Sequence, residues 1–391
     1  MMNRCGDFFI NMPPSFHSIQ LSCYFNFLSK EQEVVMNYPK LKIDLKKLRH
    51  NVETIVKLCK ENGIEVAGVT KVFCGHPEIA KAYVDGGVSY LADSRVENLI
   101  KLKDFQIPKI LLRLPMISEA EWVVEYADIS LNSELKTIEE LSKIALIKGK
   151  KHKIILMVDL GDLREGYFNE GDIYQVVGDI LNLKGIELIG LGTNLTCYGG
   201  VIPSPENLGR LVKIGKNIED RYGIKLDIIS GGNSSSLHLL LNNIKIPGIN
   251  MLRLGESLVL GLETAHGSRI ENCYDDVFQL LAEIIEVKEK PTLPIGEIGR
   301  DAFGKVPQFE DKGIRKRMIA AIGKQDVEFD TIIPVDFKVT IFGGSSDHLI
   351  LDGTDSEVDY KVGDKVKFNL SYGGILRAMT SKYVKKELIC E

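Results

Sequence analysis

The chain has 391 residues, more than one ordinary compact domain needs, so we expect two domains or one barrel with an addition. Its net charge of -5 gives no support to nucleic-acid binding, which usually leaves a basic stripe, so we expect no nucleic-acid partner. The composition is 44% hydrophobic and 26% charged, as in globular proteins with a full core, and no apolar run is long enough to cross a membrane.

Cysteine and histidine usage gives no sign of disulfides or of a metal site. The seven cysteines are scattered, odd in number and without a C-x-x-C pair, so the sequence predicts neither a disulfide framework nor a thiolate site. The seven histidines form no H-x-H or H-E-x-x-H group. We therefore predict no metal and a reducing, cytoplasmic environment.

The first 35 residues differ in character from the rest of the chain. They show no periodic pattern and lack the basic start and apolar core of a signal peptide. Gln32-Glu33-Val34 can be encoded by codons that contain a ribosome-binding sequence, shortly before the codon for Met36. We hypothesise that translation naturally begins at Met36 and that residues 1–35 come from a misplaced start; a disordered N-terminal extension is the alternative.

From Lys40 onward, short β-rich runs alternate with amphipathic helical runs. The predicted strands are Glu65–Thr70, Val88–Ala92, Lys109–Leu112, Asp128–Leu131, Lys153–Val158, Glu187–Gly192, Lys225–Ile229 and Ile249–Arg253. The predicted helices are Leu45–Asn62, Pro77–Asp85, Ser94–Leu102, Ser133–Lys148, Asp172–Asn182, Pro205–Tyr222 and Ser235–Leu241. This alternation predicts parallel strands, and eight such units fit a (β/α)8 barrel, which we assign to residues 36–265.

The pattern changes after about Ala265, where helical spacing is largely lost. The runs typical of strands are Val277–Val287, Met318–Ile322, Ile332–Val339, His348–Leu351 and Lys365–Leu370. We therefore predict an α/β fold in which a smaller C-terminal all-β domain, residues 266–391, follows the barrel. Lys40–Asp44 is a candidate partner strand for that domain and would tie the two ends of the chain together.

Active sites of barrels lie at the C-terminal ends of the strands, so the residues that follow each strand are the candidates. Lys71 follows the first strand at the barrel mouth, a suitable place for an imine-forming lysine. A lysine reaching out of the rim into solvent is the alternative. Arg164 stands in a loop bounded by Gly161 and Gly166 and is suited to hold a carboxylate or a phenolate. A surface arginine is the alternative there.

Two later strands end in segments suited to a ligand. The seventh ends in Ser230–Ser236, whose small residues, hydroxyls and helix-start N–H groups suit an anion, although serine and asparagine are also ordinary helix caps. The eighth contains Arg253 in an apolar run, where a buried charge needs a partner inside the barrel. Gly255 follows and allows close approach of the backbone.

Five segments, in order, resemble those of the alanine racemase family of fold-type III pyridoxal-phosphate enzymes, and more closely its ornithine racemase relatives. They are Val69-Thr70-Lys71, the D-x-G-x-x-R-x-G loop at 159–166, Gly232-Asn233-Ser234, the N-M-x-R-x-G segment at 250–255, and Leu370-Ser371-Tyr372. The resemblance covers nearly all of the chain from Met36 onward and agrees with the order of barrel and β domain. It implies an amino-acid racemase that removes and returns the Cα proton.

The resemblance assigns pyridoxal phosphate and its chemistry to particular residues. Lys71 would form the covalent imine and act as one acid/base, while Arg164 would lie near the cofactor phenolate and the substrate carboxylate. Arg253 would face the pyridine nitrogen. A permanent cation there disfavours protonation of that nitrogen, which favours racemisation over transamination. The other residues that would hold the cofactor are Asn194, Asn233, Ser234, Gly255, Glu256 and Tyr372.

The chain departs from the family where the second acid/base lies. The family's G-Y-A-D-G segment, whose catalytic tyrosine comes from the partner subunit, is replaced by Ile295–Gly304. Racemisation needs an acid/base on each face of the substrate, so Glu297 and Asp301 are the candidates. Binding of a substrate ammonium, or a solvated loop acid, is the alternative for both. The resemblance also implies a homodimer with active sites shared between subunits.

Further departures bear on the substrate. Cys74 replaces a tyrosine that helps with phosphate, Asn194 replaces a histidine beside the ring, and Met157 replaces a lysine that is often carbamylated. The extra acids and the missing tyrosine suit a longer, cationic amino acid, so ornithine or lysine is the expected substrate and alanine the alternative.

Other members of this superfamily are the competing interpretations. A non-catalytic pyridoxal-phosphate carrier is a barrel alone, and the β domain argues against it. A decarboxylase would carry a longer β domain and a C-terminal cysteine motif, and neither is evident in this sequence. A deaminating or aldol-cleaving relative would show metal ligands in the β domain, where His348 and Cys390 are the obvious candidates and are regarded as coincidental.

Overall fold

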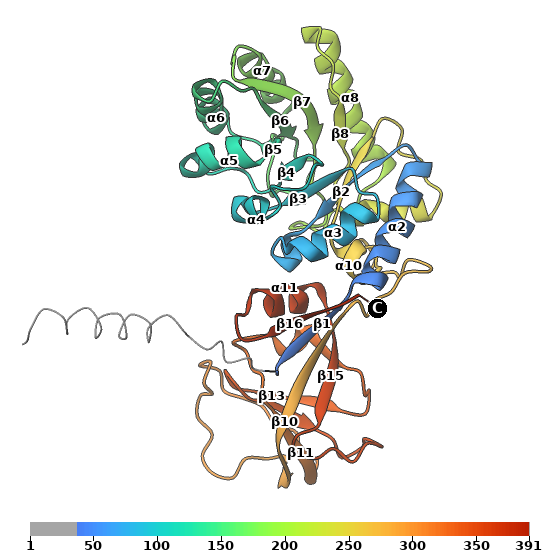
Figure 1. Ribbon diagram of the computed structural model, residues 1–391, viewed down its shortest axis with the longest axis vertical. Coiled ribbons are helices and arrows are strands. Elements are labelled where there is room, and N and C mark those ends of the chain that lie inside the picture. Colours follow the sequence, from blue (N-terminus) through green and yellow to red (C-terminus); the bar gives the residue numbers. More distant parts are fainter. Residues whose placement is uncertain (1–36, 391) are drawn as a thin grey trace, which may run out of the picture. The chain divides into compact units, whose positions relative to one another are not determined.

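The computed structural model describes residues 37–390, whose strands form a closed barrel and a second, open sheet (Figure 1). The segment 1–35, for which we hypothesised a misplaced start, lies outside the described residues. Within residues 37–390, no helix is both long enough and apolar enough to cross a membrane.

Eight parallel strands close into the barrel, each pairing with the next and β9 pairing with β2. Their bounds are Glu65–Val69 (β2), Tyr90–Asp93 (β3), Lys109–Leu111 (β4), Ile129–Asn132 (β5), His152–Met157 (β6), Ile186–Gly192 (β7), Ile228–Ser230 (β8) and Met251–Leu254 (β9). The predicted (β/α)8 barrel and each of its predicted strands are confirmed, with differences of only a few residues at the strand ends.

Helices connect the strands on the outside of the barrel (Figure 1). They are α2 (Leu45–Glu61), α3 (Pro77–Asp85), α4 (Val96–Lys101), α5 (Ala120–Tyr126), α6 (Leu135–Ile147), α7 (Glu170–Leu181), α8 (Pro205–Tyr222), α9 (Leu237–Leu241) and α10 (Glu256–Leu260). The ends of α8 show how the sequence specifies a helix: Ser204 and Asn207 form a capping box, and Gly223 closes the helix with a φ of 64°. Helices α5 and α10 were not predicted, because seven and five residues carry too little periodicity.

The barrel interior is packed with aliphatic side chains. They belong to Ala67, Val69, Ala92, Ile110, Ile129, Leu131, Ile155, Met157, Ile189, Ile228 and Met251. Inward-pointing residues of alternate strands fill barrels of this kind in layers, which leaves the strand ends for polar chemistry.

The second sheet has eight strands and includes the first strand of the described chain. Its members are β1 (Lys40–Asp44), β10 (Phe278–Pro291), β11 (Ile314–Ala320), β12 (Ile332–Pro334), β13 (Thr340–Gly344), β14 (Leu349–Asp352), β15 (Lys365–Leu370) and β16 (Lys385–Ile389). β1 pairs antiparallel with β10 and parallel with β16. The predicted pairing of Lys40–Asp44 with the late strands is therefore confirmed.

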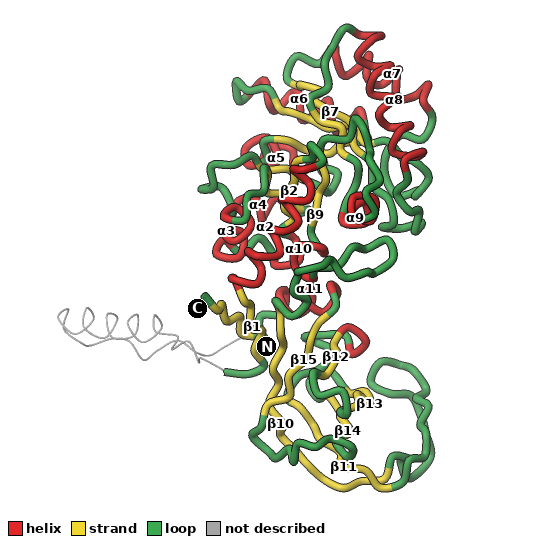
Figure 2. The backbone as a smooth tube through the Cα atoms, turned by 90° about the vertical axis from the view of Figure 1, so that its right-hand side faces the viewer, coloured by secondary structure: helices red, strands yellow, loops and turns green. Residues whose placement is uncertain are grey.

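The region after Ala265 also contains a helix, so it is not built from strands alone. Helix α11 (Tyr372–Thr380) follows β15 (Figure 2). It packs against η1 (Lys71–Phe73), the 3-10 turn after β2. It was missed because Gly373 and Gly374, at its start, are poor helix formers. Strand β16 was also missed, since its sequence KKELI lacks a clear alternation of polar and apolar residues. The short strand β13 was not predicted either.

Candidate active site

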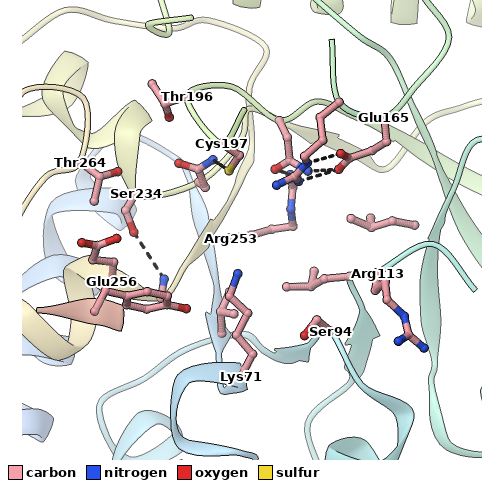
Figure 3. A pocket seen from close by; sticks show the side chains of 18 of the residues that line it. Lys71, Ser94, Arg113, Glu165, Thr196, Cys197, Ser234, Arg253, Glu256 and Thr264 are labelled. Carbon is pink, nitrogen blue, oxygen red and sulfur yellow. Dashed lines mark hydrogen bonds and ion pairs between the residues drawn. The ribbon is translucent and has the colours of Figure 1, made fainter. Parts of the chain in front are cut away.

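A cavity of about 880 Å³ lies at the C-terminal ends of the barrel strands. Figure 3 shows side chains from several strand ends that point toward its centre. Every residue that the sequence assigned to the cofactor lines it: Lys71, Asn194, Asn233, Ser234, Arg253, Gly255, Glu256 and Tyr372, together with Arg164. A cavity of this size is typical of small-molecule sites.

Lys71 is positioned by the way in which β2 ends. Thr70 donates its backbone N–H to the carbonyl of Ala92 (2.8 Å) and its hydroxyl to the buried carboxylate of Asp93 (2.6 Å). The chain then turns through η1, and the Lys71 side chain extends into the cavity (Figure 3). Lys71 Nζ lies 5.8 Å from the ring centroid of Tyr372. Although Lys71 is solvent-exposed, it points into the cavity and not away from the rim.

Hydroxyl and backbone N–H groups converge at one end of the cavity. Ser234 Oγ lies 3.0 Å from Ser257 Oγ and accepts from the backbone N–H groups of Ser257 (3.2 Å) and Gly255 (3.4 Å). Both serines are buried. A Cβ on Gly255 would lie 3.2 Å from the Cβ of Val69, so a side chain there would crowd the end of β2. Because Ser234 Oγ accepts these two bonds, its own O–H is left to donate. This neutral group of Ser234, Gly255 and Ser257, which we call the anion cradle, is suited to an oxyanion.

Tyr372 and Glu256 line the cavity beside the anion cradle. Burial, and secondly the Glu256 carboxylate, raise the pKa of Tyr372 well above its usual value, so its hydroxyl stays protonated and able to donate. Burial also raises the pKa of Glu256, and the positive charge of Lys71 opposes this rise. The three side chains are therefore electrostatically coupled.

Arg253 projects from β9 into the barrel and is 3% exposed. Its Nη2 donates to the carbonyl oxygen of Thr193 (2.6 Å) and to Asn194 Oδ1 (2.7 Å), and its Nη1 donates to Ser230 Oγ. Burial lowers the pKa of Arg253 to about 10, while the carboxylate of Glu165 acts in the opposite direction. The partners inside the barrel that we expected for Arg253 are thus the oxygens of Ser230, Thr193 and Asn194, with the carboxylate of Glu165 nearby.

Arg164 forms an ion pair with Glu165, a residue that the sequence analysis did not single out. Arg164 Nη2 lies 2.7 Å from Glu165 Oε1, and Arg164 Nε donates to the other carboxylate oxygen. Asn194 Nδ2 donates to the same carboxylate. Burial acts to raise the pKa of Glu165, but the bonds from Arg164 and Asn194 outweigh it and lower this pKa. The sequence signal that could have pointed to Glu165 is its position next to Arg164, in the loop between Gly161 and Gly166.

The side chain of Asn233 serves mainly the backbone. Its Oδ1 accepts from the N–H of Ser235 (2.9 Å), and its Nδ2 donates to the carbonyl of Leu195 (2.9 Å) and to Cys197 Sγ (3.3 Å). Asn233 therefore caps the turn η3 (Ser234–Ser236), which is the ordinary capping role that we had kept as the alternative. The segment combines this cap with the Ser234 hydroxyl that faces the cavity.

Glu297 and Asp301 do not line the cavity; they lie in the segment that joins β10 to β11. Asp301 Oδ1 accepts from the backbone N–H groups of Lys305 (2.8 Å) and Phe303 (2.9 Å). These hydrogen bonds, that of Lys305 first, lower the pKa of Asp301. Glu297 is exposed. The structure therefore does not bring either acid to the cavity of its own chain.

Two further charged residues of the cavity were missed because they lie outside the recognised motifs. Arg113 follows β4 and pairs with Glu119 (Nη2 to Oε2, 2.6 Å). The buried Glu263 accepts from the N–H groups of Ala265 and Ser268, each at 2.9 Å, and so fixes the loop at the rim. Among the described residues, no group of three His, Cys, Asp or Glu side chains could hold a metal ion.

Comparison with known sequences identifies close relatives. Residues 43–263 match the family model for the alanine racemase N-terminal domain. The chain is 51% identical to ornithine racemase from Acetoanaerobium sticklandii over 352 residues, which cover 90% of this chain and 100% of that protein. It is 40% identical to lysine racemase from Thermotoga maritima over 353 residues, which cover 90% of this chain and 98% of that protein.

Solved structures share the fold. An alanine racemase from Clostridium difficile 630 matches with a TM-score of 0.67 at 21% identity, covering 90% of this chain and 96% of that one. The alanine racemase from Bartonella henselae with covalently bound pyridoxal phosphate matches with a TM-score of 0.68 at 19% identity, covering 90% and 99%. At these identities the likeness establishes the fold alone, so function rests on the sequence relatives and the cavity.

Proposed function

Because this chain belongs to the alanine racemase family and is an amino-acid racemase, we propose that it interconverts the L and D forms of ornithine with pyridoxal phosphate carried on Lys71. The observation that carries the proposal is the 51% identity to an ornithine racemase over that protein's full length. The cavity supports it, because a lysine, an anion cradle and a buried arginine line one space.

The cavity fits pyridoxal phosphate, the cofactor bound by members of this family. The Ser234 hydroxyl of the anion cradle, together with the backbone at Gly255 and Glu256, would hold the phosphate, and the protonated hydroxyl of Tyr372 would donate to it. Asn194 and Arg253 would face the ring. When bound, the cofactor withdraws electrons from Cα of the amino acid and so makes its proton removable.

The residues of the chain then divide the work of proton exchange at Cα. Lys71 removes or returns the proton on one face. Arg164 binds the substrate carboxylate with the N–H groups that Glu165 leaves free. Arg253 remains a cation at neutral pH and keeps a proton off the ring nitrogen, which favours racemisation over transamination.

For the opposite face we propose Glu297, supplied by a second copy of the chain. Asp301 is the weaker candidate, because its carboxylate already holds its own loop and its lowered pKa makes it a poorer base. The same segment exposes large apolar side chains, with Ile295 94% and Val306 65% exposed, as expected of a surface that contacts another subunit. A homodimer with shared active sites follows from this assignment.

Ornithine is our first choice of substrate, lysine the second and alanine the alternative. Beside the cations Lys71, Arg113, Arg164 and Arg253, the cavity carries the carboxylates of Glu256 and Glu263, which supply acceptors for a second ammonium group of the substrate. The lysine racemase relative supports the second choice.

Incubation of an L-amino-acid panel in deuterium oxide tests the reaction and the substrate. We expect deuterium at Cα and loss of optical rotation, fastest for ornithine, slower for lysine and slowest for alanine. Deuterium entry without inversion would refute racemisation by two bases. Inversion of alanine alone would refute the ornithine assignment.

The remaining features fit an enzyme and not a cofactor carrier. The second sheet and α11, which supply Tyr372 to the cavity, have no place in a carrier that is a barrel alone. We assign residues 36–265 to the barrel domain and 266–391 to the β domain, with β1 of the first segment pairing into the sheet of the second. We place the enzyme in the cytoplasm, since the five cysteines among the described residues are all free.

A further inference from the structure

Four polar side chains of the cavity form one continuous series of hydrogen bonds. Arg164 and Asn194 both donate to the carboxylate of Glu165, and Arg253 donates to Asn194 Oδ1. The order is Arg164, Glu165, Asn194, Arg253, and Figure 3 shows the bonds around Glu165. The members come from the loop after β6, the loop after β7 and strand β9. We call this series the arginine–glutamate network.

Glu165 and Arg253 together determine which way round the Asn194 amide lies. An ionised carboxylate only accepts hydrogen bonds, and a guanidinium only donates them. Asn194 stands between the two, so its Nδ2 faces Glu165 and its Oδ1 faces Arg253. The opposite orientation would place N–H groups of Asn194 against those of Arg253. Without the carboxylate at position 165, Arg253 alone would hold this orientation, and Asn194 Nδ2 would lose its charged acceptor.

Glu165 also sets the charge of this part of the cavity. Its side chain is 13% exposed and that of Arg164 is 40% exposed, while Arg253 is 3% exposed. With Glu165 ionised, two cations and one anion leave a net charge of one; without it, the buried Arg253 and the partly exposed Arg164 would be two cations with no anion between them. The Arg164 charge lowers the pKa of Arg253, and the Glu165 charge raises it.

The loop that carries Glu165 is held tightly enough to fix the position of its carboxylate. Gly166 has a φ of 118°, and a Cβ on it would lie 2.6 Å from the backbone nitrogen of Asp159. The Asp159 carboxylate in turn accepts from the N–H of Gly161 (2.8 Å). A glycine is required where the loop closes, and the acid next to it therefore has little freedom to move away from Asn194.

We propose that Glu165 is a positioning residue of the racemase, which acts through Asn194 to orient Arg253 toward the cofactor ring and which steadies Arg164 for the substrate carboxylate. The inference rests on the proposed function, because it takes the ring to lie against Asn194 and Arg253. In this role Glu165 acts through Asn194 and Arg164 and not on the reacting atoms. It occupies only part of the Arg164 guanidinium, which has five N–H donors, so a substrate carboxylate does not need to displace it.

Glu165→Gln tests the proposal, because glutamine keeps the size of the side chain and loses both the charge and the acceptor-only character. We expect the dissociation constant for pyridoxal phosphate, measured by titrating the apo-enzyme, to rise about tenfold. The acid limb of the pH profile of kcat/KM should move to lower pH, because one more positive charge opposes protonation of neighbouring groups. A merely structural role would leave that limb in place.

Glu170→Gln is the matched control. Glu170 is also paired with an arginine, Arg210, at 3.1 Å, but both side chains are about 40% exposed and lie outside the cavity. Its dissociation constant for pyridoxal phosphate should equal that of the wild type. The double variant Glu165→Gln/Asn194→Ala should bind the cofactor no more weakly than Asn194→Ala alone, since Glu165 acts through Asn194.

The outcomes separate this inference from the proposed function. If the wild type neither binds pyridoxal phosphate nor racemises any amino acid, the proposed function is wrong and this inference falls with it. If the wild type does both and Glu165→Gln shows an unchanged dissociation constant and pH profile, only the inference is overturned. Fully additive losses in the double variant would overturn the route through Asn194. Should Glu165→Gln fail to fold, Glu165→Asp, which withdraws the carboxylate but keeps its charge, must weaken cofactor binding, and unchanged binding would overturn the proposal.

Discussion

We predict that His152 makes the barrel sensitive to acid, because its imidazole is buried where a charge is poorly solvated. The residue is 3% exposed at the start of β6, and its Nε2 lies 2.8 Å from Ser130 Oγ. Burial lowers the pKa of His152 from 6.5 to about 4. Between these values the unfolded chain binds a proton that the folded chain does not, so the stabilisation is complete above pH 6.5 and is lost as the pH falls. At about 1.4 kcal/mol per pH unit, this one group removes roughly 3 kcal/mol by pH 4.

The substitution His152→Gln removes the titrating group but keeps a side chain able to bond Ser130. Urea unfolding, followed by circular dichroism between pH 7 and pH 5, gives the free energy of unfolding of each protein. We expect the wild type to lose about 2 kcal/mol more than the variant over that range. Ser130→Ala is the control, because it deletes the partner and keeps the imidazole, so the pH dependence should persist. Parallel curves for the wild type and His152→Gln would refute the reasoning.

Three substitutions test the site itself. Lys71→Ala should abolish turnover and the cofactor absorbance at about 420 nm, and a variant that stays yellow would contradict the assignment of this lysine. Ser234→Ala should raise the dissociation constant for pyridoxal phosphate about tenfold in an apo-enzyme titration, and an unchanged constant would argue against the anion cradle. Glu297→Gln should lower kcat by about 10²–10⁴, far more than Asp301→Asn does; equal losses would remove Glu297 as the second base.

The barrel was predictable because its signals are local. Each strand is a short apolar run, and helices such as α8 carry their own caps in Ser204, Asn207 and Gly223. The elements that were missed have weak local signals. Helix α11 begins with two glycines, and its stability comes from burying residues such as Ile375 and Ala378. Tertiary contacts of this kind cannot be predicted from the periodicity of one segment.

The candidate site was predictable as a set of residues but not as a network. Lys71, Arg164 and Arg253 follow or occupy strand ends and carry recognisable motifs, so their convergence could be expected. Nothing in the sequence was a reason to choose Glu165 over other acids. Its proposed role depends on contacts with Asn194 and, through Asn194, with Arg253, which lies nearly 90 positions further along the chain. Our proposal for Glu297 invokes a second subunit, and the fold of a single chain does not test it.

Residues 40–61 contribute a strand to the second sheet and a helix to the barrel, and this has a mechanical consequence. β1 is a strand of the second sheet, yet the next residue already belongs to α2 of the barrel, and the chain crosses back only after the barrel, on its way to β10. Two covalent connections therefore join the two parts of the enzyme, and between them they resist twisting about either one. Tyr372 is thereby held in register with Lys71. Separate expression of the two parts would sever β1 from β10 and β16, so the halves are not expected to behave as independent modules.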